Sequence, residues 1–123
     1  MKSTPPEFPI VFSRLRGILQ EHASKFTITS DTADHYCLEI PFSPRFKKRF
    51  PVAWAKVSKS YVSLHYMPMY FLPGLQKTLS AKLKARMQGK SCFNFKSVDE
   101  ELFQELRELV SRGFESSRKA AVL

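Results

Sequence analysis

Short segments in which apolar and polar residues alternate are the feature that most limits the fold of this chain. The segments FTITS (26–30) and HYCLEI (35–40) alternate in this way around the turn-like SDTAD, which predicts a β-hairpin. The segment VAWAKVSKSYVSLHYM (52–67) predicts a second hairpin that turns near Ser58–Ser60, and KSCFNFK (90–96) predicts a fifth short strand. Because this alternation is typical of strands that bury one face, the segments predict an antiparallel sheet with one covered face.

Two amphipathic helices are predicted near the two ends of the chain. In residues 8–25 the apolar residues recur at helical spacing, at Val11, Leu15, Ile18 and Leu19. The SVDE motif (97–100) predicts a capping box in which Ser97 begins the last helix. The apolar residues that this helix is predicted to bury are Leu102, Phe103, Leu106, Leu109, Val110 and Phe114.

The segments between these helices complete the predicted order of elements. The proline-bounded PFSPRFKKRFP (41–51) predicts a loop, and LPGLQKTLSAKLKARMQG (72–89) predicts a middle helix that ends at a Gly89 cap. The order helix, four strands, helix, strand, helix predicts an α+β fold, with an antiparallel sheet of about five strands and helices packed on one face. The stripe along the middle helix consists of Leu75, Leu79, Leu83 and Met87.

Length and cysteine content fit a single small domain spanning residues 1–123. The chain is 43% hydrophobic, which is enough for a modest core. The opening MKSTPPEFPIVF has too short an apolar run and too many prolines for a signal peptide or a membrane span. The two cysteines, Cys37 and Cys92, do not make a disulfide framework, so we expect a cytoplasmic protein.

Charge is distributed unevenly along the chain. The formal net charge is +9, and residues 45–96 contain twelve Lys or Arg and no Asp or Glu. Such a block indicates either an anionic partner (nucleic acid, an acidic protein or a phosphorylated small molecule) or a solvated basic surface. The predicted basic patch consists of Arg45, Lys47, Lys48, Arg49, Lys82, Lys84, Arg86 and Lys90.

Strand alternation assigns residues to the two faces of the predicted sheet. The face toward the helices is predicted to hold Ile28, Leu38, Ile40, Val57, Val62, Leu64, Phe93 and Phe95. The opposite face is predicted to hold Cys37, Glu39, Cys92 and the candidate ligand-binding residues Trp54, Lys56, Tyr61, Ser63, His65, Asn94 and Lys96. This second face is either a platform for a flat or anionic ligand or an ordinary half-exposed sheet. Trp54 favours the platform, because a fully exposed tryptophan is rare without a partner.

The GKS tripeptide at residues 89–91 does not predict a nucleotide-binding P-loop. That motif needs a glycine five residues earlier, where this chain has Lys84, and it needs a strand before the loop rather than after it. No nucleophile motif accompanies the histidines, so we expect no catalytic residues. The histidine and cysteine spacings, including His35 with Cys37, match no zinc pattern, so we expect no metal site and no cofactor.

Residues 59–114 resemble the YdhG-like family of small bacterial domains of unknown function. The resemblance depends on HYMPMY (65–70), LPGL (72–75) and QGKSCFNF (88–95), with a weaker match from Phe8 to Val57. It implies a frataxin-like α+β fold, in which GKSCFNF is a turn and a core strand. One branch of the family is regarded as an iron chaperone for iron–sulfur cluster assembly, and the family has no established catalytic residues.

These patterns together predict a module that binds rather than catalyses. The first hypothesis is that the basic surface and the polar, aromatic sheet face bind an anionic ligand, nucleic acid or an acidic protein. The alternative is frataxin-type iron handling, for which carboxylates would be needed, and Asp31, Asp34 and Glu39 are the acids near one hairpin. A small enzyme acting on a phosphorylated or carboxylated substrate is a third alternative.

Overall fold

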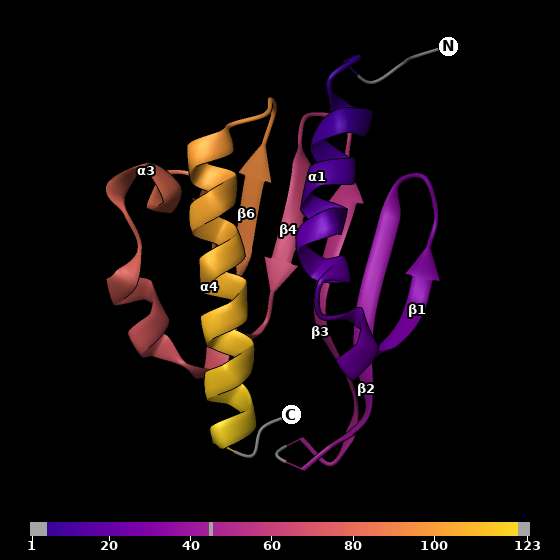
Figure 1. Ribbon diagram of the computed structural model, residues 1–123, viewed down its shortest axis with the longest axis vertical. Coiled ribbons are helices and arrows are strands. Elements are labelled where there is room, and N and C mark those ends of the chain that lie inside the picture. The colour runs from indigo at the N-terminus through magenta and orange to yellow at the C-terminus, as the bar shows by residue number, and fades with distance from the viewer. Residues whose placement is uncertain (1–4, 45, 121–123) are drawn as a thin grey trace.

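The computed structural model describes residues 5–44 and 46–120, and these residues form the α+β architecture that the sequence predicts (Figure 1). They contain one antiparallel sheet of six strands in the order β1-β2-β3-β4-β6-β5. The strands are β1 (Thr27–Asp31), β2 (His35–Ser43), β3 (Lys48–Val57), β4 (Val62–Tyr66), β5 (Met87–Gln88) and β6 (Cys92–Phe95). The helical elements are α1 (Phe8–Gln20), η1 (Ala23–Lys25), α2 (Pro68–Phe71), η2 (Pro73–Thr78), α3 (Ala81–Lys84) and α4 (Glu100–Lys119).

Both long helices, α1 and α4, pack on the same face of the sheet (Figure 1). Every apolar residue predicted to be buried on these two helices is buried. The predicted inner residues of the strands are also buried, except that Val57 is half-buried and Ile28 is 46% exposed. Ile28 lies on the edge strand β1 opposite the buried Leu38, where the helix layer does not cover it.

Both predicted hairpins are confirmed, but the predicted loop at 41–51 is wrong. Strand β2 continues to Ser43 and β3 begins at Lys48, so most of this segment is an extension of the β2–β3 ladder. Prolines are tolerated in strands where the ladder is irregular, and the register shifts at two places in this hairpin. One shift places Pro51 opposite Glu39, and Lys47 with φ 59° turns the chain back.

The predicted middle helix is interrupted. Residues 73–78 form the 3-10 helix η2, Leu79 is extended, and α3 is a separate short helix capped by the Ser80 side chain. Glu105 of α4 holds this break, because its carboxylate accepts hydrogen bonds from the backbone N–H and the hydroxyl of Ser80 at 2.8 and 2.7 Å. Leu75, Leu79 and Leu83 are buried all the same.

The remaining differences concern element ends. Met87 belongs to β5, a two-residue edge strand that the sequence did not predict. Gly89, with φ 77°, lies in the β5–β6 turn rather than capping a helix. Helix α1 ends at Gln20 rather than near Lys25. Helix α4 is capped by Asp99, whose side chain accepts from the Leu102 N–H at 3.1 Å, so Ser97 is not the cap.

Candidate functional site on the outer face of the sheet

The face of the sheet opposite α1 and α4, called here the outer face, carries a row of side chains that crosses all six strands. Paired residues in adjacent strands lie on the same face, so the register defines the row directly. From β1 to β5 the row consists of Ser30, Cys37, Trp54, His65, Cys92 and Gln88.

A second row lies next to the first and contains more of the predicted ligand-binding residues. It consists of His35, Lys56, Ser63 and Asn94. Tyr61 immediately precedes β4 and Lys96 immediately follows β6, so alternation places both on the same face, one row beyond Ser63 and Asn94. The seven predicted ligand-binding residues therefore lie on the same face of the sheet. Ser63 is only 3% exposed, so six of them line the surface of that face.

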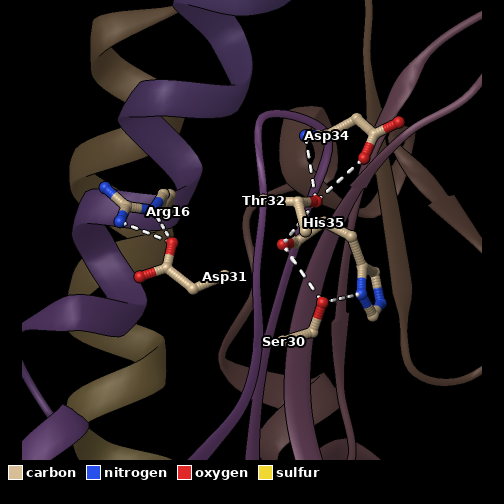
Figure 2. Close-up of polar contacts among 6 residues, drawn as sticks. All are labelled: Arg16, Ser30, Asp31, Thr32, Asp34 and His35. Carbon is tan, nitrogen blue, oxygen red and sulfur yellow. Dashed lines mark hydrogen bonds and ion pairs between the residues drawn. The ribbon is translucent and has the colours of Figure 1, made fainter.

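Trp54 is half-buried rather than fully exposed, and its partner is another residue of this chain. Its indole ring stacks on the His65 imidazole, with ring centroids 4.7 Å apart and an angle of 14° between the planes. His35, at the β1–β2 end, is held through its Nδ1 by the Ser30 hydroxyl at 2.7 Å (Figure 2). The aromatic part of the outer face is therefore a fixed surface built from two neighbouring strands.

Cys92 lies against His65 and Asn94. Its Sγ is 3.6 Å from His65 Nε2 and 3.2 Å from Asn94 Oδ1, and Asn94 Nδ2 donates to Gln88 Oε1 at 2.8 Å. Burial raises the pKa of the Cys92 thiol, which a hydrogen bond with Ser63 partly offsets. Burial, followed by the charge of Lys56, lowers the pKa of His65. At neutral pH this is a pair of an uncharged thiol and an uncharged imidazole.

The predicted basic patch is not one surface. Lys47, Lys48 and Arg49 lie at the β2–β3 turn, whereas the other described members lie near α3 and β5, at the opposite corner of the molecule (Figure 1). Arg49 is 73% exposed, and its Nε lies 2.8 Å from the mostly buried Glu39 carboxylate. Arg45 lies outside the described residues.

Near α3, the cations differ in their neighbours. Lys82 forms an ion pair with Glu101 of α4 at 3.3 Å, and Lys90 Nζ lies 5.8 Å from the centre of the Tyr70 ring. Lys84 is exposed at the end of α3. Arg86 lies four residues after Lys82 in the predicted middle helix, a spacing that would place both on one helical face, but it lies beyond the end of α3. Its backbone carbonyl accepts from Asn94, which places Arg86 at the β5 end of the second row.

The carboxylates near the β1–β2 hairpin do not converge. Asp31 turns toward α1 and pairs with Arg16 at 2.7 Å, whereas Asp34 accepts from the Thr32 hydroxyl (Figure 2). Glu39 accepts from Thr29 and lies beside Arg49. Within residues 5–44 and 46–120, no three His, Cys, Asp or Glu side chains are grouped as metal ligands.

A cavity that the sequence did not predict lies on the helix side, at the C-terminal end of α4. Its volume is about 170 Å³, and its lining is mainly apolar. Three separate elements contribute to it, which is why no local pattern revealed it. The lining residues are Lys25, Phe26, Ile40, Ser111, Phe114, Glu115 and Arg118.

Comparison of the chain with protein-family models, with curated proteins and with solved structures gives no match. Among the described helices, none is both long enough and apolar enough to cross a membrane.

Proposed function

We propose that this chain is a non-catalytic module that binds an anionic ligand on the outer face of its sheet. The observation that carries this proposal is the separation of charge between the two sides of the sheet. Strands β3, β4, β6 and β5 come from the part of the sequence without Asp or Glu, so their outer face contributes no carboxylate. Lys56 and Lys96 are exposed on that face, and neither forms an ion pair within the described chain.

The helix side is different, because its cations are largely neutralised within the molecule. Arg14 pairs with Glu100, and Arg107 pairs with Glu21 at 2.8 Å. Such exposed pairs contribute little to stability, but they remove the field that would attract an anion. The outer face is therefore the more electropositive of the two large surfaces.

Aromatic side chains on the same face suit a ligand that combines phosphates with flat rings. Trp54 and Tyr61 are half-buried and lie beside Lys56 and Lys96. Single-stranded nucleic acid has this combination, since its bases stack on aromatic rings while its backbone lies along a basic surface. We therefore select it as the ligand class to test first, with heparin as a polyanion that lacks bases.

The proposal predicts salt-sensitive binding of a single-stranded oligonucleotide, measured by fluorescence anisotropy at several salt concentrations. Replacing both Lys56 and Lys96 by Gln should lower the affinity and reduce the slope of log K against log salt by about 1.4, because each lost phosphate contact contributes about 0.7. Lys77→Gln with Lys119→Gln is the matched control, since it removes the same charge from exposed helical positions and should change the slope little. Absence of binding to both oligonucleotide and heparin at low salt would show that the basic face is only a solvated surface.

Stacking can be separated from charge in the same titration. Trp54→Ala should weaken oligonucleotide binding, by about 1–3 kcal/mol for each stacked base that is lost, without changing the salt slope. Heparin has no bases, so its affinity should be unaffected. An equal loss of affinity for both ligands would mean that Trp54 supports the fold of the face rather than stacking on a ligand.

We also propose that the chain belongs to the YdhG-like family and shares a frataxin-like fold. The stretches HYMPMY, LPGL and QGKSCFNF, together with the helix–sheet–helix order of elements, support this assignment. The iron handling that the resemblance implies has less support, because Asp31, Asp34 and Glu39 bind three separate partners.

A further inference from the structure

Cys92, a nucleophile, lies beside His65, a base. Binding of an anionic ligand does not require this pair. They face each other across β4 and β6, with Sγ and Nε2 3.6 Å apart. Both are half-buried on the outer face, so the pair is reachable from solvent while being held in place. The Trp54 ring fixes the imidazole by stacking. The Cys92 thiol donates to Oδ1 of Asn94, whose amide is held in turn by Gln88.

The sulfur of Cys92 has no disulfide partner within the described fold. Cys37, the other cysteine, is in the same row, but β3 and β4 lie between their strands. Three strand spacings separate the two residues by about 14 Å, whereas a disulfide needs Cα atoms about 4.4–6.8 Å apart. Cys37 is also buried, at 6% exposure, so Cys92 is the thiol that a reagent meets first.

The surroundings of Cys92 favour an anionic reactant. Lys56 lies in the neighbouring row on the same face and Lys96 lies one row further along β6, and no strand from β3 to β5 brings a carboxylate there. A neutral imidazole with an unprotonated Nε2 can accept the thiol proton as the sulfur attacks, which is the general-base arrangement used to activate thiols. The uncharged resting state of the pair fits this role, because the base is free to take a proton at neutral pH.

We propose that Cys92 is a modification site that captures a low-molecular-weight disulfide carrying carboxylates, with His65 as the base. The Sγ of Cys92 attacks one sulfur of the disulfide, forming a new S–S bond as the old one breaks. The proton of the thiol passes to His65 Nε2 and then to the leaving thiolate or to solvent. The products are a mixed disulfide at Cys92 and one molecule of the reduced thiol, so the small disulfide is the oxidant.

The preference for an anionic disulfide relies on the proposed function, because the same cations would attract both ligands. The adduct would place negative charge beside Asn94 and Trp54, where the polyanion is expected to bind. Modification should therefore lower the affinity for a single-stranded oligonucleotide at least tenfold, and a thiol reductant should restore it.

The experiment measures the second-order rate constants of Cys37→Ala protein with an anionic reagent, 5,5′-dithiobis(2-nitrobenzoate), and with a neutral one, 4,4′-dithiodipyridine. Intact and peptide mass spectrometry of the protein with both cysteines present should show one adduct, at Cys92. The ratio of the anionic to the neutral rate constant should fall several-fold in the Lys56→Gln, Lys96→Gln protein. It should be unchanged in the Lys77→Gln, Lys119→Gln control.

His65→Gln should slow both reagents at pH 7, by about 10²-fold if His65 is the base. Because this variant also loses the Trp54 stack, the pH profile of the unsubstituted pair provides an independent test. A base-assisted reaction should give a slope of log rate against pH well below one between pH 7 and 8. A slope of one, as for an unassisted thiol with a raised pKa, would overturn the role of His65.

Failure of this inference is distinguishable from failure of the proposed function. Oligonucleotide binding is measured separately on Cys92→Ser protein, which cannot form the adduct. Normal binding by that variant, combined with an unreactive Cys92 or an adduct only at Cys37, would refute the modification site alone. Adduct formation with no charge preference would refute the selection of anionic disulfides.

Discussion

At the scale of single residues, Gly113 is the one of the four glycines at which an added Cβ would meet a neighbour within 4 Å in the described structure, and that neighbour is the Tyr66 ring. Tyr66 is fully buried, and its hydroxyl donates to the Val110 carbonyl of α4 at 2.5 Å. A Cβ added at Gly113 would lie 2.8 Å from Cε2 of the Tyr66 ring and would also clash with its hydroxyl oxygen. Glycine at this position lets β4 and α4 approach closely, which no local sequence pattern reveals.

We expect Gly113→Ala to lower the free energy of unfolding by about 1–3 kcal/mol, because the added methyl group must displace a packed ring. Helix propensity alone predicts the opposite, a gain of up to about 1 kcal/mol. Gly17→Ala in α1 is the matched control, since a Cβ there meets nothing within 4 Å, and it should show that gain. Urea unfolding measures both, and equal gains would mean that Tyr66 moves aside at no cost.

At the scale of elements, alternation and helical periodicity predicted those segments whose structure depends on their own sequence. Both hairpins and α4 are of this kind. The middle segment is not, because Glu105 of α4 stabilises the break at Ser80, and that contact joins residues 25 apart. Strand β5 has only two residues, too few for any period to be visible, and it exists by pairing with β6.

In the candidate site, the sequence predicted which face each residue lies on but not which residues contact each other. Alternation placed Trp54 and His65 on one face, but their stacking depends on the β3–β4 register, which places them directly opposite each other. The contact between Cys92 and His65 depends in turn on β6 pairing with β4, a relation between strands separated by the whole α2–α3 segment.

The N-terminal cap of α4 is Asp99 rather than the predicted Ser97, and the two residues can be compared by mutation. Asp99→Ala should lower the free energy of unfolding by about 1 kcal/mol, because the N–H of Leu102 loses its acceptor. Ser97→Ala should change it by less than about 0.5 kcal/mol, since Ser97 is exposed and does not cap the helix. Thermal or chemical unfolding of the two variants compares them directly. A larger effect at Ser97 than at Asp99 would favour the capping box that the sequence suggested.

At the scale of the whole molecule, the acid-free segment of the sequence supplies four of the six described strands, while its short helices α2 and α3 pack against α4. The four adjacent strands β3, β4, β6 and β5 come from this segment, whereas the glutamates of residues 100–115 lie on α4, on the other side of the sheet. Composition therefore located the part of the chain that has no carboxylates. It could not predict which cations share a surface, and the β2–β3 turn and the α3 region prove to be at opposite corners (Figure 1).

The two layers of the molecule each contain a histidine whose titration is linked to folding. His22 is buried on the helix side, where its Nε2 lies 3.3 Å from the Ser111 hydroxyl and its ring meets Phe114 edge-on. Burial, followed by the charge of Lys25, lowers the pKa of His22. Burial, followed by the charge of Lys56, likewise lowers the pKa of His65 on the outer face.

Because both folded-state pKa values lie below the ordinary value of 6.5, the unfolded chain binds protons more readily than the native one as the pH falls. Stability should therefore change little between about pH 7 and 7.5 and should decrease as the pH falls from 6.5 toward the lowered pKa values. The range from pH 5 to 7.5 isolates this effect, since carboxylates titrate mainly below it. The free energy of unfolding, measured by urea titration across this range, should lose part of its pH dependence in His22→Gln and more in His22→Gln, His65→Gln. An unchanged pH dependence in the double variant would mean that folding does not lower the pKa of either imidazole.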